Sequence, residues 1–337
     1  MPASTSFVTA NDPCDARNIN SGPNPTQRTA NCQAAFTALG LPANFQLTSQ
    51  VQVATVQGTT AGAPTLTNEV ADQWSVGFVY QPHFVPNLAV HFDWVHIDIK
   101  DAIANFGLGS ILQVCYDSAP GNDACSRFER GTSALATTRQ GQILTAGEAG
   151  SAGPRGGFIN AGYTDFAGFT AGIDYRLELS DFGADWFGGN PGHLNFDYDL
   201  FHVQRQQTSV TGLGFDLNRS HGEIGNPKYQ WKLETTYERD ELAIIWTTNW
   251  TARSSFNDDF NLETRYPLQV NDYYVNDVAV TYDLSKYVEK MGYGFKGAQA
   301  RVIVKNVFDK EAPYGTTGLG VYDILGRYYL VGLTARF

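Results

Sequence analysis

The sequence predicts an all-β fold, an antiparallel transmembrane β-barrel with long extracellular loops. The first observation is the closing segment 327–337, in which apolar side chains alternate with mostly polar or small ones. The apolar members share one face at period two: Tyr329, Val331, Leu333, Ala335 and Phe337. The other two observations are that earlier segments repeat this alternation and that the connections between them are alternately long and short. Only a closed barrel lets such strands satisfy their backbone hydrogen bonds in lipid.

Eight earlier segments are the other predicted strands. In chain order they cover 74–80, 88–101, 158–179, 194–200, 229–238, 242–253, 278–284 and 300–308. The first two are joined by a short turn at 82–87, and 229–238 is followed after only Asp240 and Glu241 by 242–253. The clearest is 158–179, because apolar and polar side chains alternate from Phe169 to Leu179 without a break.

A further candidate strand lies at 45–56, since Phe45, Leu47, Val51 and Val53 alternate with Gln and Thr side chains. The chain would then carry nine or ten strands, and ten is an even number of the kind that bacterial barrels show. We therefore expect an extracellular loop region at 1–70, including this candidate strand, and barrel strands at 71–337.

The composition is compatible with a barrel. Mean hydropathy is -0.26, and alternation keeps the average of a barrel polar. Aromatic residues make up 13% of the chain, which suits the aromatic girdles at the membrane interfaces. The net charge of -11 argues against a nucleic-acid partner, because phosphate neutralisation needs clustered Lys and Arg.

The connection lengths predict which end of each strand faces which side of the membrane. Transmembrane barrels have short turns at the periplasmic end and long loops outside. Reading back from the C-terminus, this rule places Phe337 at the periplasmic end. It places the longest loop, 107–157, outside the cell.

The four cysteines form two local pairs, Cys14 with Cys32 and Cys115 with Cys125. Four cysteines allow three pairings, and the local pairing closes two loops of sensible size. In an oxidising compartment we expect two disulfides rather than metal-bound thiols, because no CxxC spacing occurs. The second pair would lie outside the cell, whereas the side of the membrane for the first pair stays open.

The polar faces of the predicted strands carry charged side chains that could line the barrel lumen. These are Asp174, Arg176, Glu178, Asp197, Asp199, Lys232, Glu234, Arg253, Asp277 and Arg301. They could contact a plug or guide a solute, or they could simply form a solvated wall. We predict no metal site, cofactor or enzyme activity, because the chain has no phosphate loop, nucleophile elbow or HExxH motif. The one local His/carboxylate cluster, His91 with Asp93 and His96 with Asp98, fits lumen-facing polar residues.

Several stretches resemble the TonB-dependent outer-membrane receptors. Residues 58–69 followed by Trp74–Pro82 are similar to the family's Gly-Asn-Pro-x-Leu-x-x-Glu stretch before a strand. Residues 94–103 resemble the next strand, and Val304-Lys-Asn-Val-Phe-Asp-Lys310 is similar to the near-terminal Asn-Leu-Phe-Asp motif. With the closing aromatic strand, the resemblance covers about residues 55–337 in the right order.

The resemblance implies a 22-stranded barrel that encloses a plug domain and is energised by the TonB complex. This chain would supply only its C-terminal strands, with the plug absent, so TonB would act through an N-terminal region that is missing here. Phe337, with Tyr329, Val331 and Leu333, resembles the terminal signal that the barrel-assembly machinery recognises. The first ten residues have no secretory signal, so we expect the natural start to lie upstream.

The expected function is active uptake of a large extracellular solute, either a siderophore-type metal chelate or a carbohydrate, across the lipid of the bacterial outer membrane. One alternative is a complete small barrel that acts as a passive pore or adhesin, with 45–53 as its tenth strand and the Cys14–Cys32 loop in the periplasm. Another is a soluble β-sandwich binding module. We disfavour the sandwich because segments such as 242–246 would then expose a large apolar patch.

Overall fold

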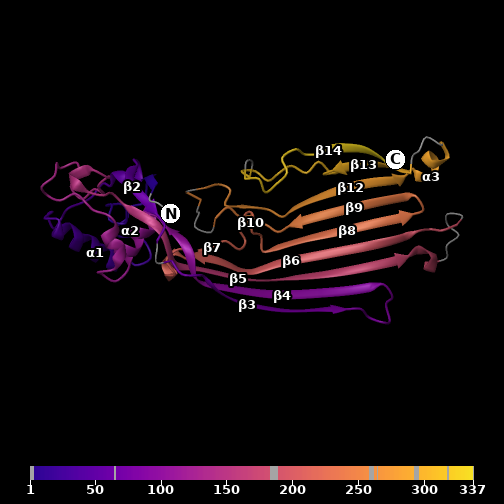
Figure 1. The fold of residues 1–337 in the computed structure, drawn as a ribbon, viewed down its shortest axis with the longest axis horizontal. Helices are drawn as coiled ribbons and strands as arrows, with labels where there is room; N and C mark the ends of the chain where they lie inside the picture. The colour runs from indigo at the N-terminus through magenta and orange to yellow at the C-terminus, as the bar shows by residue number, and fades with distance from the viewer. Residues whose placement is uncertain are drawn as a thin grey trace. The chain divides into compact units, whose positions relative to one another are not determined.

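A computed structural model describes residues 4–63, 66–182, 189–257, 262–263, 265–291, 296–316 and 319–336. The strands are β1 (Ser4–Val8), β2 (Val56–Ala61), β3 (Val70–Tyr80), β4 (Leu88–Phe106), β5 (Arg155–Glu178), β6 (His193–Ser209), β7 (Asn218–Arg219), β8 (Tyr229–Arg239), β9 (Leu242–Thr251), β10 (Ser254–Ser255), β11 (Gln269–Val270), β12 (Tyr273–Asp283), β13 (Gly297–Lys305) and β14 (Tyr328–Arg336). The predominance of strands confirms the predicted all-β class (Figure 1).

The helices lie between strands. The α-helices are α1 (Pro25–Ala38), α2 (Leu108–Asp117) and α3 (Ser285–Val288), and the short 3-10 helices are η1 (Gln50–Gln52), η2 (Asp123–Arg127), η3 (Glu148–Gly150), η4 (Leu179–Phe182), η6 (Gly214–Asp216) and η7 (Glu289–Met291). In the part of the chain that the structure describes, no helix has the length and apolarity needed to cross a membrane.

The nine predicted strands are present as β3, β4, β5, β6, β8, β9, β12, β13 and β14, and each pairs with the next. The register is antiparallel from β6 to β14. At the other end, the Arg176 N–H donates to the Asn87 carbonyl, so the end of β5 lies beside the start of β4. Among the described residues β3 pairs only with β4, and β14 only with β13. The sheet is therefore an open, partial barrel wall.

Strand boundaries differ from the predicted ones by a few residues. β4 continues to Phe106 and β5 begins at Arg155, whereas β13 covers Gly297–Lys305 instead of 300–308. β13 ends early because Asn306 adopts a φ of 52°, in the left-handed region, and so leaves the extended conformation. The turn between β8 and β9 is the expected pair Asp240 and Glu241, with Asp240 at φ 48°.

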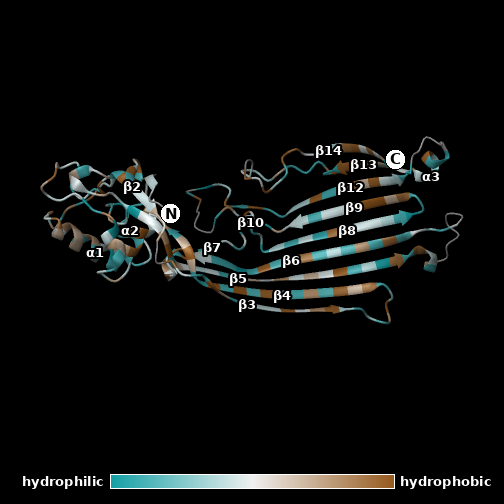
Figure 2. Cartoon of the chain, in the orientation of Figure 1, coloured by the Kyte–Doolittle hydropathy of each residue, from teal (hydrophilic) through white to brown (hydrophobic). Residues whose placement is uncertain are grey.

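The register keeps apolar side chains on one face of this sheet. One row runs across five strands through Tyr237, Ile244, Val280, Val302 and Val331. Hydrophobic and hydrophilic residues follow one another along β4 and β6, as Figure 2 shows. Since successive side chains point to opposite faces, the sheet has one apolar and one polar face.

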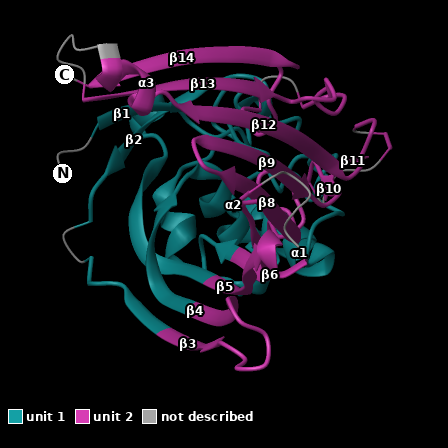
Figure 3. Cartoon of the chain, turned by 90° about the vertical axis from the view of Figure 1, so that its right-hand side faces the viewer, with its two compact units in different colours: residues 1–72, 98–164, 208–218 teal, residues 73–97, 165–207, 219–337 magenta. Residues whose placement is uncertain are grey.

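The chain divides into two compact units, which Figure 3 shows in different colours. Unit 1 contains residues 1–72, 98–164 and 208–218, and unit 2 contains 73–97, 165–207 and 219–337. Unit 1 thus joins the expected N-terminal loop region to the long connection between β4 and β5, and unit 2 contains most of the strand wall.

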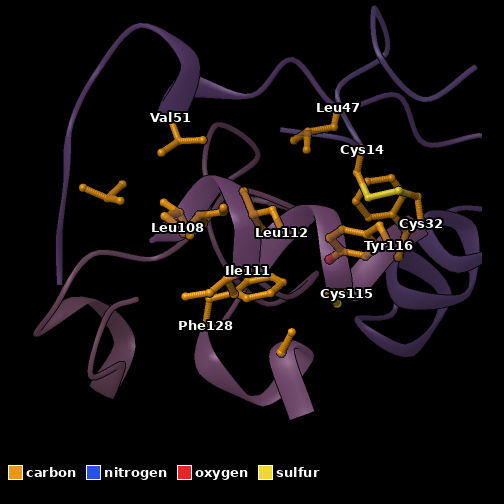
Figure 4. Packing of buried hydrophobic residues seen from close by; sticks show 14 of the residues in the cluster. Cys14, Cys32, Leu47, Val51, Leu108, Ile111, Leu112, Cys115, Tyr116 and Phe128 are labelled. Carbon is orange, nitrogen blue, oxygen red and sulfur yellow. A yellow bond between two sulfur atoms is a disulfide. The ribbon is translucent and has the colours of Figure 1, made fainter. Parts of the chain in front are cut away.

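The core of unit 1 forms around α2. Its apolar side chains Leu108, Ile111, Leu112 and Cys115 are buried and recur at helical spacing. They pack with Phe36 of α1 and with Val51, as the close-up in Figure 4 shows for several of them. Pro25 occupies the first turn of α1, where its missing N–H is tolerated.

The candidate strand at 45–56 is not formed. Leu47 makes only an isolated bridge to Asp15, residues 50–52 form η1, and a regular strand begins only at Val56. Alternation did not predict the structure here because the conformation of this segment is set by packing in unit 1. Leu47 and Val51 are both in the unit 1 core, whereas Val53 is 84% exposed. The alternative of a complete small barrel therefore lacks its tenth strand, which it placed at 45–53.

Candidate functional site

The polar face of unit 2 carries a row of directly paired side chains. Asp197 of β6 lies opposite Glu234 of β8, Glu234 opposite Thr247 of β9, and Thr247 opposite Asp277 of β12. A neighbouring row pairs Asp199 with Lys232 and Lys232 with Asn249. The structure therefore brings five of the predicted lumen-facing residues onto one continuous surface.

His91 links three strands on this face. Its Nδ1 lies 3.7 Å from Asp174 Oδ2 of β5, and its Nε2 lies 3.5 Å from Asp199 Oδ1 of β6. Gly172 leaves room for the imidazole, because a Cβ there would come within 2.1 Å of the His91 ring. The sequence identified His91 only through its proximity to Asp93, since its real partners are set by strand pairing.

The other predicted residues also have definite surroundings. Arg176 Nε and Glu178 Oε1 form an ion pair at 2.6 Å, and Lys232 Nζ lies 3.0 Å from Glu234 Oε2. Arg301 lies on the same face as Thr281, its register partner. Arg253 differs from the rest because it follows the end of β9, and its backbone N–H donates to Asp272 Oδ1.

The sequence did not indicate one ion pair of this face. Lys305 Nζ at the end of β13 lies 2.7 Å from Asp277 Oδ2 of β12. Asp277 Oδ1 also accepts the Asn306 backbone N–H at 2.8 Å. The sequence feature that could have indicated this ion pair is the Val-Lys-Asn segment at 304–306. The partner of Lys305 depends on the register between β12 and β13, which the sequence alone does not give.

The apolar face carries rows of aromatic rings. Phe78, Phe92, Phe169, His202 and Tyr229 follow one another across five strands, with ring-centroid separations between 4.0 and 5.9 Å. A second row runs from Tyr198 through Trp231 to Trp250. Such rings match the amphipathic belt of side chains that a barrel presents at a membrane interface.

The proposed barrel-assembly residues lie on β14. Tyr329, Val331 and Leu333 occupy alternate positions and are all exposed, Val331 by 81%. Phe337, the terminal residue of that prediction, lies outside the described residues. Recognition by the assembly machinery stays a prediction.

Both expected disulfides are present. Cys14 is bonded to Cys32, with Cα atoms 5.5 Å apart, and Cys115 to Cys125, with Cα atoms 4.9 Å apart. All four residues belong to, or pack against, the core of unit 1. The two disulfides therefore stabilise one core.

A buried ion pair organises the same unit. Arg130 donates from Nη2 to Asp12 Oδ1 at 2.6 Å, from Nη1 to Asp12 Oδ2 at 2.9 Å, and from Nε to the Tyr116 hydroxyl at 2.8 Å. Burial alone would raise the pKa of the Asp12 carboxyl, but the charge and hydrogen bonds of Arg130, with a bond from Ser49, lower it below its ordinary value. Asp117 and Arg28 form a second buried pair.

The described residues contain no group of three or more His, Cys, Asp and Glu side chains placed to hold a metal ion. His96 contacts Asp165 Oδ1 at 3.0 Å and does not meet His91.

These features define a class of protein: a partial wall of an outer-membrane β-barrel, with one lipid-compatible face and one polar face. The family described as TonB dependent receptor-like, beta-barrel matches residues 33–307. The chain belongs to this family, and it is a bacterial outer-membrane protein. No curated protein matches the sequence.

The fold is shared with two receptors of solved structure, each at a TM-score of 0.50. The siderophore receptor PirA from Acinetobacter baumannii is 16% identical with a TM-score of 0.50, over 83% of this chain and 34% of PirA. A mutant of the ferric enterobactin receptor PfeA from Pseudomonas aeruginosa is 15% identical with a TM-score of 0.50, over 83% and 33%. The FrpB iron transporter from Neisseria meningitidis is 16% identical with a TM-score of 0.46, over 82% and 32%. The chain spans about one third of each.

Proposed function

We propose that this chain forms part of the barrel wall of a receptor for active uptake of a large solute, a siderophore-type chelate or a carbohydrate, across the outer membrane. The family membership supports a receptor. The polar face, with its cross-strand ion pairs, suits contact with a plug or a passing solute. The family's TonB contact would be made by a plug region and not by these strands.

The observation that carries the proposal is the direction of the two edge strands. Nine strands pair in sequence from β3 to β14, and the pairs from β6 to β14 are antiparallel. The Arg176–Asn87 and Leu179–Gly192 backbone hydrogen bonds join the end of β5 to the starts of β4 and β6, and the short connection 81–87 makes β3 and β4 a hairpin. The first and the last strand therefore point the same way. Joining them directly would create a parallel pair, whereas transmembrane barrels of this kind are antiparallel. An odd number of additional strands is therefore needed for closure, which disfavours a small pore built from these nine strands alone.

The experiment that tests active uptake compares energised and de-energised cells of the host. Uptake of 55Fe-labelled ferric enterobactin, 55Fe-labelled ferric desferrioxamine and 14C-labelled maltotriose is measured in a gene deletion strain and in the complemented strain. We expect complementation to restore uptake of at least one solute, and a protonophore to abolish that uptake. Restored uptake that resists the protonophore would indicate a passive pore and contradict the proposal.

A further inference from the structure

A pocket of about 340 Å³ lies on the polar face within unit 2. Its floor is built by register, because Gln230 of β8 pairs with Thr251 of β9, and Thr251 pairs with Tyr273 of β12. Asn249 and Asp277 extend this floor along their strands. The volume is at the lower end of the range of about 300–1,000 Å³ for small-molecule sites.

The segment between β13 and β14 lines another side of the pocket. It contributes Val321, Tyr322 and Asp323, while Tyr328 at the start of β14 pairs with Lys305 at the end of β13. Tyr322 is only 8% exposed, and its ring meets the ring of Tyr273 edge to face at 5.0 Å. The pocket thus combines aromatic walls with amide, hydroxyl and carboxylate groups.

One polar atom of this pocket is unsatisfied. Tyr273 is 7% exposed, and its hydroxyl is buried without a hydrogen-bond partner among the described residues. A buried hydroxyl without a partner is unfavourable, and most such groups in folded proteins are bonded. A ligand that brings a hydrogen-bonding group beside Tyr273, with a small shift of Tyr322, would remove this penalty.

The charges in the pocket disfavour an anion. Lys305, the cation in its wall, is already paired with Asp277 at 2.7 Å. Asp323 adds a second carboxylate, whose Oδ1 accepts the Leu325 N–H. Burial raises the pKa of the Tyr322 hydroxyl, with a further rise from Tyr273, so it remains a neutral donor. Hydroxyl groups can both donate to the carboxylates and accept from amide and phenol groups.

We propose that this pocket binds the end unit of a neutral oligosaccharide, with Tyr273 and Tyr322 as the residues that recognise it. This inference rests on the proposed uptake function and specifies the solute as carbohydrate. Sugar rings offer C–H faces to the two tyrosines and hydroxyl groups to Gln230, Asn249 and Asp323. An anionic chelate would be repelled by the Asp323 carboxylate, and Lys305 would not offset this because it is already paired with Asp277.

Calorimetric titration tests the assignment on the protein extracted from the outer membrane in detergent. The probes are maltotriose, cellotriose, xylotriose and chitotriose, with ferric enterobactin as an anionic competitor. We expect saturable binding of at least one oligosaccharide that the chelate does not displace. Absence of binding for all four at millimolar concentration would overturn the inference.

The substitution Tyr273→Phe removes only the unsatisfied hydroxyl. We expect it to weaken oligosaccharide binding about three- to tenfold, the effect of one hydrogen bond. The matched control is Tyr274→Phe, because Tyr274 is the next residue and lies on the apolar face, opposite Trp250 in register. Unchanged affinity in a folded Tyr273→Phe protein would overturn the role of this residue, since a merely structural tyrosine would leave binding unaffected.

The binding experiment and the uptake experiment can fail independently of each other. Protonophore-sensitive uptake of a ferric chelate, together with no oligosaccharide binding, would overturn the pocket assignment and leave the uptake proposal intact. Protonophore-resistant uptake would instead contradict the proposed function, whichever sugar binds.

Discussion

At the scale of single residues, the buried pair of Asp12 and Arg130 organises the core of unit 1. Their side chains are 0% and 3% exposed. Arg130 also lies over the Tyr116 and Phe128 rings, at 5.2 and 5.6 Å from their centroids. Each of the three guanidinium nitrogens of Arg130 thus donates a hydrogen bond, and aromatic rings lie against the face of the group. Such a pair fixes one arrangement of the surrounding segments, because either partner alone would be an uncompensated buried charge.

The substitution Arg130→Met should destabilise unit 1 by roughly 3–5 kcal/mol, since it leaves the Asp12 charge buried without its partner. Pulsed hydrogen exchange on α2 peptides at increasing urea concentration measures this free energy of unfolding. Lys100→Met is the control in the same unit, because Lys100 pairs with Asp72 at 3.8 Å and both side chains are exposed, by 61% and 66%. Equal stability of the two variants would contradict a structural role for the buried pair.

The lowered pKa of Asp12 makes the stability of unit 1 sensitive to acid. The pKa of Asp15 is also lowered, to about 2, mainly by the hydrogen bond from the Arg17 side chain. A group whose pKa is lower in the folded state contributes stability above its ordinary value of 3.8, and this is lost as the pH falls through the folded value. We expect the urea midpoint of the α2 peptides to be level above about pH 5 and to fall below pH 4. A midpoint that rises on acidification would contradict this assignment.

At the scale of elements, the account depends on the opposite character of the two strand faces. Val280 of β12 is in the apolar row between Ile244 and Val302. Thr281, the next residue, is on the polar face, opposite Ala243 and Arg301. A charge on the first face must be placed in lipid, whereas a charge on the second meets polar groups.

The substitution Val280→Arg should therefore destabilise the folded protein by up to about 4 kcal/mol, the largest cost of a cation on the lipid face of a barrel. Thr247→Arg on β9 is the control on the polar face and should cost much less, because Thr247 lies opposite the carboxylates Glu234 and Asp277. Urea unfolding in lipid vesicles, followed by tryptophan fluorescence, measures both. A larger loss for Thr247→Arg would mean that the faces are assigned the wrong way round.

The strands could be predicted because alternation at period two is a local property of the sequence. The stripe formed by Leu108, Ile111 and Leu112 would also have identified α2, had helical spacing been sought in the long loop. The alternation at 45–56 misled because the burial of Leu47 and Val51 is decided by distant segments that fold around them. The carboxylate contacts of His91 and the Lys305 ion pair were not predictable, since their partners follow from cross-strand register.

At the scale of the whole molecule, the two edge strands of the described sheet have no partner strand on their outer side. β3 and β14 run in the same direction, and each has an unpaired edge among the described residues. An unpaired strand edge cannot remain within lipid, because its N–H and C=O groups would have no partners there. The wall therefore needs further strands between these two edges.

The topology also predicts which segments face the outside of the cell. The connection between β4 and β5 is the longest and contains Cys115 and Cys125, whereas the short turns are at the other strand ends. The exposed Ala134 is on the long connection. The exposed Lys290 follows α3, in the connection between β12 and β13. These two positions should thus lie on opposite sides of the outer membrane.

Labelling of single cysteines in intact cells tests this central claim most directly. Ala134→Cys and Lys290→Cys are each treated with a membrane-impermeant maleimide, while the native cysteines are protected in their disulfides. Position 134 should be labelled in intact cells, and position 290 only after the outer membrane is opened. Labelling of position 290 but not 134 in intact cells would contradict this orientation, as would labelling of both.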